Sequence, residues 1–467
     1  MTTTDLCFTT LTELAGLIES KEVSPVEATQ AELDRIEAID GTLHSYITVL
    51  PDAAMRAARE AEQEIMRGEY RGPLHGVPVA VKDLFFTKDV RTTCASKILA
   101  HWVPDYDATV VAKLKAAGAV LLGKLNMTEF ACIDYHPSYQ RPLNPWNPGR
   151  WPGASSSGAG VATAAGLCYG SLGSDTGGSI RFPSACCGIV GIKPTYGRVS
   201  RHGVFPLAES LDHVGPMARS VSDAAALLRV IAGFDPDDPT SCRESVGDYF
   251  ATMRNGIKAI RIGVDESYCK DHADPEVSAA VLAAAGVMRD LGADIREVSI
   301  HGVDEAVSTW SVIFAAEVAA AHETTFPSRA ADYGSGIRTF LQQGVAVSGV
   351  EYAKAQVTRQ VIRRTFDDLF QRVDLLLCPS ALVPPPPIAD PSSPVVIDPD
   401  SIKLQLRTTA PMSLTGSPTI SLPCGFTAQG LPISLQLIGR HLDEALLCQA
   451  AHAYEQAMEW SERRPQV

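Results

Sequence analysis

Two stretches near the start of the chain place apolar residues at helical spacing. The first, "SPVEATQAELDRIEAID", has Ser24 as a cap, Pro25 in the first turn and Glu27 to complete a capping box. The second, "DAAMRAAREAEQEIMRG", has Asp52 at the position of a cap and Gly68 as its stop. Both stretches therefore predict helices.

Short apolar runs then alternate with further helical patterns. "GVPVAVKD" predicts a buried strand that ends at Lys82, "DATVVAKLKAAG" a helix, and "AVLLG" a second strand. The alternation continues through "AIRIGV", "EVSAAVLAAAGVMRDLG" and "ADIREVSI". Strands that alternate with helices are typical of α/β proteins, so we expect an α/β fold with a mixed or parallel sheet covered by helices.

One proline-rich stretch, "PSALVPPPPIADPSSPVVIDPDS" (379–401), follows neither pattern and predicts an extended loop over the surface. Strand-like "DLLLC" precedes it and "PTISLPCGF" and "ISLQLIG" follow it, so the loop is expected inside a domain rather than between two. The 467 residues, 45% hydrophobic and 20% charged, are typical of a soluble globular protein. Size alone allows one large α/β domain or several smaller ones.

Charge and cysteine usage narrow the function classes. The net charge is −14, from 40 Lys and Arg against 54 Asp and Glu, so we expect no direct binding of nucleic acid. The eleven cysteines show no C-x-x-C pair and no zinc spacing, which favours free thiols in a reducing cytoplasm. "MTTTDLCFTTLTELAG" lacks the features of a signal peptide, and no stretch approaches the roughly 20 apolar residues of a membrane span. A cytoplasmic chain that does not enter a membrane is expected.

Serine and glycine are concentrated between residues 153 and 179, in "PGASSSGAG" and the start of "GSDTGGSIRFP". A Gly-Gly pair can be plain turn chemistry, since glycine adopts positive φ at little cost. It can also leave backbone N–H groups free to hold an anion. Serine-rich loops are often linkers, but these flank small-residue elements in the predicted core, where hydroxyl groups need hydrogen-bond partners.

Lys82 ends the apolar run "VPVAV" and is followed by Asp83. One interpretation is a lysine that reaches solvent at the strand end and pairs with Asp83. The other is a lysine held in a site of low dielectric, where loss of hydration lowers its pKa and the neutral amine becomes a base. A base beside serines can turn one of them into a nucleophile.

Together, "GVPVAVKDLF", "PGASSSGAG", "GSDTGGSIRFP" and "LPCGFTAQGLPISLQLIGR" resemble the amidase signature family, and the similarity runs across nearly the whole chain. The resemblance implies one amidase signature domain over 1–467, with a large mixed β-sheet covered on both faces by α-helices. The expected parts are N-terminal helices (1–70), a signature core (71–235), a more variable region (236–370) and the C-terminal part of the core (371–467).

The family uses a Ser–cisSer–Lys triad. Matched onto this sequence, Lys82 is the base, Ser155 is the relay serine on a cis peptide, and Ser179 is the nucleophile. Alanine precedes Ser155 where glycine is common in the family, and three serines follow one another in this loop. Ser156 is therefore the alternative relay.

The resemblance also places an oxyanion hole at the backbone of Thr176, Gly177, Gly178 and Ser179. Free N–H groups before the start of a helix can face a developing negative oxygen, which agrees with this assignment. Side chains at the two glycines are expected to crowd the substrate carbonyl. Arg181 either ties down this loop or binds a carboxylate of the substrate.

The implied activity is that of an amidohydrolase, which cleaves a small-molecule carboxylic amide to the acid and ammonia or an amine through an acyl-enzyme on Ser179. No metal or cofactor is implied, and a homodimer is expected. The family also includes the glutaminase (A) subunit of a tRNA-dependent amidotransferase and hydrolases of ureas or carbamoyl compounds. A catalytically silent binding subunit is a further alternative, against which the intact triad argues.

The glutaminase branch is similar to this chain in "YGRVSRHGVFPLAESLDHVGPMARS", but its members usually carry an arginine and an aspartate that hold glutamine. At the corresponding places this chain has Thr339 or Phe340, and Leu406. The motifs do not fix the substrate.

Pocket walls are expected from 126–135, from the region around Trp310 and Phe314, and from the proline-rich stretch. Together with Phe130 and Ile133, these apolar side chains favour an aryl or alkyl acyl group, although they suit core packing equally well. The candidate substrate contacts are Phe130, Ser156 and Arg181.

Overall fold

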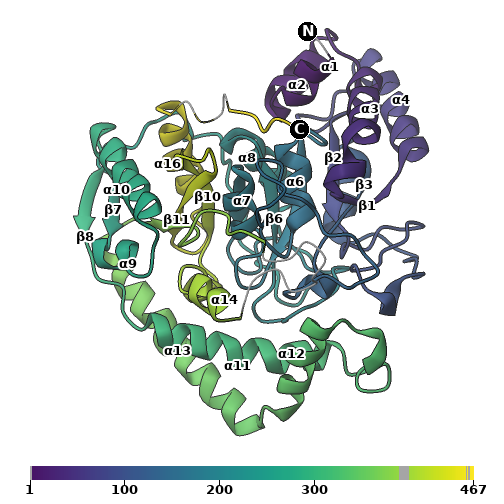
Figure 1. The fold of residues 1–467 in the computed structure, drawn as a ribbon. Coiled ribbons are helices and arrows are strands. Elements are labelled where there is room, and N and C mark those ends of the chain that lie inside the picture. The colour runs from purple at the N-terminus through teal and green to yellow at the C-terminus, as the bar shows by residue number, and fades with distance from the viewer. Residues whose placement is uncertain (1–2, 389–398, 459, 461–462) are drawn as a thin grey trace.

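The computed structural model describes residues 3–388, 399–458, 460 and 463–467. One mixed 11-stranded sheet runs through its centre in the order β1-β3-β2-β4-β6-β5-β10-β11-β9-β7-β8 (Figure 1), which confirms the predicted α/β class. The strands are β1 (Tyr46–Val49), β2 (Pro78–Lys82), β3 (Val120–Leu125), β4 (Gly170–Asp175), β5 (Val190–Lys193), β6 (His213–Ala218), β7 (Arg261–Val264), β8 (Asp294–Glu297), β9 (Leu375–Pro379), β10 (Thr419–Phe426) and β11 (Pro432–Gly439).

Strand β2 pairs in parallel with both β3 and β4, whereas β4 pairs antiparallel with β6. Parallel neighbours end at the same edge of a sheet, and this edge is where open α/β sheets bind ligands. The register pairs Val81 with Leu172, so the next residue, Lys82, lies close to Ser174 at the end of β4. The sheet topology therefore brings the predicted base to the serine- and glycine-rich loop.

Helices cover both faces of the sheet, as β4 shows. A Cβ on Gly170 would meet Leu227 of α8, whereas the hydroxyl of the next residue, Ser171, lies 2.9 Å from that of Thr163 in α6. Successive strand residues point to opposite faces, so α6 and α8 lie on opposite sides. The helices are α1 (Thr3–Phe8), α2 (Leu11–Glu19), α3 (Pro25–Leu43), α4 (Pro51–Met66), α5 (Thr109–Ala116), α6 (Ser157–Ala164), α7 (Arg181–Cys187), α8 (Val221–Ile231), α9 (Glu266–Lys270), α10 (Pro275–Asp290), α11 (Val303–Ala321), α12 (Ser335–Ala346), α13 (Gly349–Arg372), α14 (Pro399–Leu406), α15 (Ala410–Thr415) and α16 (Glu444–Gln456).

The two predicted N-terminal helices are present as α3 and α4. The capping box of Ser24 and Glu27 is formed at the start of α3, as expected. The predicted cap of α4 is wrong, because the helix already begins at Pro51 and Asp52 lies in its first turn. Gly68, with φ of +86°, follows the end of α4 and supplies the predicted stop.

The proline-rich stretch is only partly a surface loop. Residues 389–398 lie outside the described part of the chain. Before them, Ala381 and Leu382 are buried, and the carbonyl of Pro386 accepts a hydrogen bond from the backbone of Trp151 (2.9 Å). After them, the chain enters α14. Ala381 also shares a buried apolar cluster with Trp151, and this packing overrides the surface position that the composition predicted.

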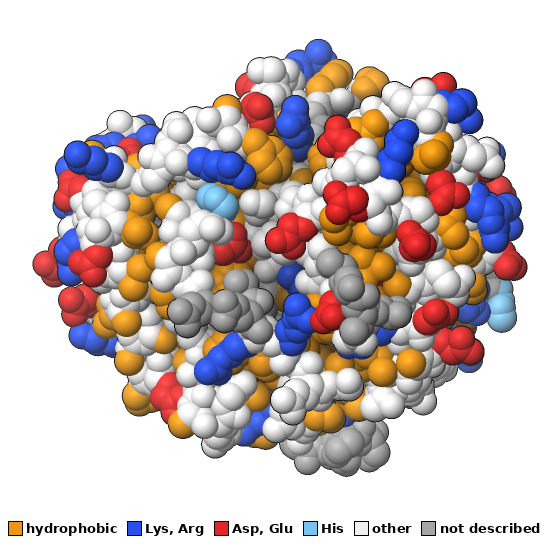
Figure 2. Space-filling model, turned by 90° about the horizontal axis from the view of Figure 1, so that it is seen from above, with side chains coloured by type: hydrophobic (Ala, Val, Ile, Leu, Met, Phe, Trp, Pro, Cys, Tyr) orange, Lys and Arg blue, Asp and Glu red, His pale blue; other side chains and the backbone are white. Residues whose placement is uncertain are grey.

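Helices α11, α12 and α13 form a layer along the lower side of the molecule in Figure 1, and α11 contacts both of the others. This layer closes over the loop that follows β4, because Trp310 of α11 donates a hydrogen bond from Nε1 to the carbonyl of Thr176 (3.0 Å). On the face shown in Figure 2, acidic and basic side chains are interspersed, and neither sign gathers in one continuous patch. No helix in the described residues is long and apolar enough to cross a membrane.

Candidate active site

A cavity of about 570 Å³ lies beside the loop that follows β4. Ser155 and Ser179, the predicted relay and nucleophile, both line it. The predicted wall residues Ile133, Trp310 and Phe314 line it too, with Trp310 and Phe314 stacked at a centroid distance of 4.5 Å. Phe340 and Leu406, which the sequence placed where the glutaminase branch holds its substrate, also line it. Sequence reasoning missed other apolar walls that come from distant segments: Trp151, Phe182, Leu207 and Ile402.

Lys82 is fully buried, and its amino group is surrounded by serine hydroxyls. Nζ donates to the Oγ atoms of Ser155 (2.7 Å), Ser156 (3.0 Å) and Ser174 (2.9 Å). An ammonium can supply three such bonds, but a neutral amine has only two protons and one lone pair. When Lys82 is neutral, one of the hydroxyls can therefore donate to it, which is the arrangement that a base and a relay require.

The pKa of Lys82 is lowered to about 7 because burial removes the hydration of the ammonium form. The carboxylates of Asp175 and Asp212 act in the opposite direction and limit the fall. The alternative of a solvated strand-end lysine paired with Asp83 is wrong, since Asp83 lies 3.3 Å from the amino group of another buried residue, Lys124. Lys82 is thus partly neutral near pH 7.

The backbone at Ser155 has the predicted cis peptide bond, between Ala154 and Ser155. Ser156 follows it but does not line the cavity: its hydroxyl accepts from Lys82 and donates to the carbonyl of Ser174 (3.1 Å). The prediction that Ser156 contacts the substrate is therefore wrong, because the side chain points to the lysine. Its backbone N–H instead donates to the carbonyl of Ser179 (3.2 Å).

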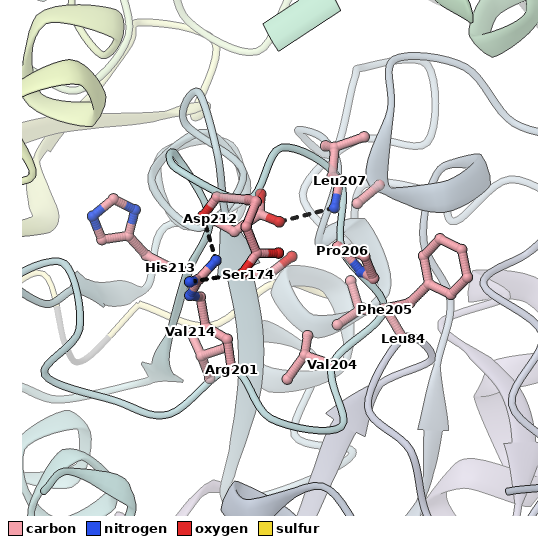
Figure 3. Close-up of a pocket in the computed structure, with 12 residues that line it drawn as sticks. Leu84, Ser174, Arg201, Val204, Phe205, Pro206, Leu207, Asp212, His213 and Val214 are labelled. Carbon is pink, nitrogen blue, oxygen red and sulfur yellow. Dashed lines mark hydrogen bonds and ion pairs between the residues drawn. The ribbon is translucent and has the colours of Figure 1, made fainter. Parts of the chain in front are cut away.

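Ser174 is a part of this site that sequence reasoning missed. Besides contacting Lys82, it lines a second, much smaller cavity of about 20 Å³, which has room for about one water molecule (Figure 3). Asp212 lines the same space and accepts hydrogen bonds from the backbone of Leu207 (2.8 Å) and the hydroxyl of Thr176 (2.6 Å). Burial raises the pKa of Asp212 to about 6, and the bond from Thr176 limits the rise.

The backbone of the loop after β4 is organised by the buried carboxylate of Asp175. It accepts hydrogen bonds from the N–H groups of Gly178 (2.8 Å) and Ile180 (3.1 Å). Gly178 was predicted as an oxyanion donor, and the structure contradicts this because its N–H is already bonded. Gly178 is also absent from the cavity wall, whereas Thr176, Gly177 and Ser179 line it.

Of the N–H groups predicted as oxyanion donors, those of Thr176, Gly177 and Ser179 have no acceptor among the described residues, and the direction of the last two follows from the carbonyls behind them. The carbonyl of the peptide before Gly177 is held by Trp310 Nε1 (3.0 Å), and that before Ser179 by the backbone of Phe182 (2.7 Å). In a trans peptide the N–H points opposite to the carbonyl, so both N–H groups point away from these donors. Neither has an acceptor among the described residues.

The glycines make room for the cavity walls rather than for a substrate carbonyl. A Cβ on Gly177 would overlap the indole ring of Trp310, and a Cβ on Gly178 would overlap the ring of Phe182. Gly178 also has φ of +128°, a conformation that other residues rarely adopt. The structure therefore shows crowding of Trp310 and Phe182 at these two positions, whereas the predicted crowding of a substrate carbonyl stays a prediction.

Arg181 ties down the loop, and its predicted contact with substrate is wrong. The side chain is fully buried and forms two bonds to the Asp175 carboxylate, from Nε (3.0 Å) and Nη2 (2.8 Å). A third bond runs from Nη1 to the carbonyl of Thr409 (3.1 Å). Burial alone would raise the pKa of Asp175, but the Arg181 guanidinium holds it well below its usual range.

Replacing Arg181 with methionine should lower the free energy of unfolding by about 3–5 kcal/mol, because it leaves the buried Asp175 carboxylate without its cation. The midpoint of urea unfolding measures this loss. An exposed ion pair offers the control: Lys270→Met removes the partner of Glu266 on the surface and should change stability little. A stable R181M enzyme that binds only acidic amides more weakly would restore the substrate role.

Phe130 was also predicted to contact substrate, and the structure contradicts this. It adopts φ of +48° and is buried against Phe205 and His322, with centroid distances of 4.8 and 4.5 Å. The turn at Phe130 sends its ring into the core, while the following residues, including Ile133 and Asp134, reach the cavity. An unusual backbone conformation at a non-glycine residue leaves no signal in the apolar pattern.

Known proteins resemble this chain over nearly its whole length. A family model described as Amidase matches residues 27–448. The "Putative amidase AmiD" of Mycobacterium tuberculosis (strain ATCC 25618 / H37Rv) is 46% identical over 457 residues, 98% of this chain and 96% of that protein. The A subunit of the glutamyl-tRNA(Gln) amidotransferase of Moorella thermoacetica (strain ATCC 39073 / JCM 9320) is 43% identical, with 99% of each chain covered.

A solved structure described as revealing the evolutionary origins of an s-triazine catabolic enzyme shares the fold, with a TM-score of 0.90 and 33% identity. The match covers 98% of this chain and all of that one. The chain belongs to the amidase signature family.

Proposed function

We propose that this protein is an amidohydrolase that cleaves a small carboxylic amide through an acyl-enzyme on Ser179. The observation that carries the proposal is the 2.7 Å contact between Lys82 Nζ and Ser155 Oγ, in a site where burial brings the pKa of the lysine to about 7. Ser155 and Ser179 line one cavity, so a substrate carbonyl bound there meets both hydroxyls.

In the proposed mechanism, neutral Lys82 accepts a proton from Ser155, which accepts one from Ser179. The Ser179 oxygen attacks the amide carbon and forms a tetrahedral intermediate. Its negative oxygen is stabilised by the free N–H groups of Gly177 and Ser179, and one such donor typically contributes about 10²–10³ in rate. The proton then returns through Ser155 to the leaving nitrogen, the C–N bond breaks, and water releases the carboxylic acid.

The cavity walls support an alkyl or aryl acyl group, because most of the lining side chains are apolar or aromatic. The glutaminase alternative finds less support. A free glutamine carries an ammonium and a carboxylate on one carbon, and both need partners when they leave water. Thr339, Phe340 and Leu406, which stand where that branch is expected to carry its charges, all line this cavity.

We expect the purified chain alone, as a homodimer in a reducing cytoplasm-like buffer, to hydrolyse at least one neutral amide. The panel should contain aliphatic amides, arylamides, ureas and glutamine, with ammonia or amine release as the readout and light scattering for the oligomeric state. Activity on glutamine that appears only when a partner protein and charged tRNA are both added would favour the glutaminase alternative over the amidohydrolase. Turnover of ureas above amides would favour the carbamoyl alternative.

A further inference from the structure

Asp134 is the one carboxylate among the described residues that line the catalytic cavity, and Lys403 is the one cation. Every other lining side chain described is apolar or uncharged. Asp134 has no role in the mechanism above, because Lys82 and the two serines account for the proton transfers. An acidic group in a cavity whose other walls are almost all uncharged therefore needs another explanation.

One oxygen of the half-buried Asp134 side chain lacks the hydrogen-bond partner that a shielded carboxylate atom usually has. Its Oδ1 atom is shielded from solvent and accepts no hydrogen bond from the described residues. Its other oxygen lies against Gly336, in the first turn of α12, where a Cβ would overlap it. Burial is the one cause that raises the pKa of Asp134, to about 6, so no cation of the described chain lies close enough to lower it.

We propose that Asp134 binds a protonated amino group at the far end of the substrate's acyl chain, which makes ω-amino amides the preferred substrate class. The inference rests on the proposed amidase function. The uncharged walls hold the carbon chain, and the ammonium pairs with the Asp134 carboxylate through Oδ2, because Oδ1 is shielded. The net charge of −14 also attracts cations to the protein.

The same geometry separates this class from glutamine and from acidic amides. The two charges of glutamine sit on one carbon. If its ammonium bound Asp134, its carboxylate would also lie beside Asp134. No described cation influences the pKa of Asp134, so the glutamine carboxylate would lack a partner there. An amide with a terminal carboxylate would face repulsion from Asp134 and find only the exposed Lys403. A substrate that carries an ammonium group and no carboxylate therefore suits the carboxylate of Asp134 best.

The test uses matched pairs of linear substrates, in which ω-aminoalkanamides are compared with n-alkanamides that carry a methyl group in place of the ammonium. A series of chain lengths finds the one that spans the cavity. At that length, the wild-type enzyme should favour the ammonium substrate in kcat/KM. Asp134→Asn keeps the shape but removes the charge, and should reduce this preference, the ratio of kcat/KM for the two series on the same variant, about 10- to 100-fold.

Asp105→Asn is the matched control, since it removes one negative charge from an exposed position outside the cavity and should leave the preference unchanged. A second measurement needs no variant: boronic acids that bind the Ser179 site should inhibit the wild-type enzyme more tightly with a terminal amino group than with a methyl group. If Asp134→Asn does not fold, this comparison of inhibitors tests whether the cavity prefers a terminal ammonium.

Three outcomes would overturn the inference while the proposed function stands: equal kcat/KM for both series at every length, a preference that Asp134→Asn leaves unchanged, or a preference for terminal carboxylates. The proposed function itself fails in a different way. In that case neither series is hydrolysed, and a fluorophosphonate does not label Ser179.

Discussion

Replacing Ser179, the proposed nucleophile, with alanine should lower kcat for amide hydrolysis by about 10⁶-fold, as loss of the nucleophile does in serine hydrolases. The hydroxyl is partly exposed in the cavity and makes no hydrogen bond within the described residues, so its removal takes away no structural contact. The urea midpoint and circular dichroism of the variant should therefore match those of the wild-type protein. Turnover is measured by release of ammonia.

A fluorophosphonate provides the direct test, because it forms a covalent bond with an activated serine. Peptide mapping should find the label on Ser179 and not on the buried Ser155. Ser308→Ala is a suitable control, since Ser308 is exposed on α11 and does not line the cavity. A folded S179A enzyme with near-normal turnover, or a label on Ser155, would remove the proposed mechanism.

Replacing Lys82 with methionine should slow amide hydrolysis more than hydrolysis of an activated ester with the same acyl group. An amide nitrogen must be protonated before it leaves, whereas a nitrophenolate leaves unaided. Each general acid–base step is worth about 10²–10⁴ in rate, and Lys82 is proposed to act in two of them for the amide. The anilide-to-ester ratio of kcat/KM measures the difference.

The pH profile of the wild-type enzyme tests the same group independently. The neutral amine of Lys82 is the proposed base, so kcat/KM should fall about tenfold for each pH unit below the lysine pKa and level off above it. Burial places that pKa at about 7, well below the ordinary value for lysine, and the midpoint should lie there rather than near pH 10. The K82M enzyme should lose this titration.

Equal losses of amide and ester hydrolysis in a folded K82M enzyme would mean that Lys82 activates the nucleophile but does not protonate the leaving group. Loss of neither activity would exclude Lys82 from catalysis. Lys124 offers a comparison, because it is equally buried but bonded to Thr92 and the carbonyl of Phe85 outside the cavity. K124M should destabilise the protein without changing the amide-to-ester ratio.

The sequence predicted those features that depend on local patterns or on long, specific motifs. The strand that ends at Lys82 follows from an apolar run, and the capping box of α3 from residues three positions apart. The α/β class follows from alternation along the chain. Ser174 was missed because its contact with Lys82 depends on the parallel pairing of β2 with β4, which no local pattern specifies.

The errors at the site have a common physical origin, which is the direction in which a group points. Gly178 and Arg181 were placed in the correct loop, but the Asp175 carboxylate bonds to both of them from inside the protein. Phe130 was placed in the correct segment, but a turn directs its ring into the core and leaves Asp134 to reach the cavity. Residue type does not encode such directions.

The indole of Trp310 makes two contacts at the site, and one substitution would change both. Its ring forms part of the wall that is proposed to hold the acyl group, and its Nε1 atom donates to the carbonyl behind the N–H of Gly177. A substitution that reshapes this wall for a larger molecule would also release the peptide that is proposed to stabilise the transition state. New specificities should therefore arise more readily from α12 and α14, whose side chains can vary without disturbing that peptide.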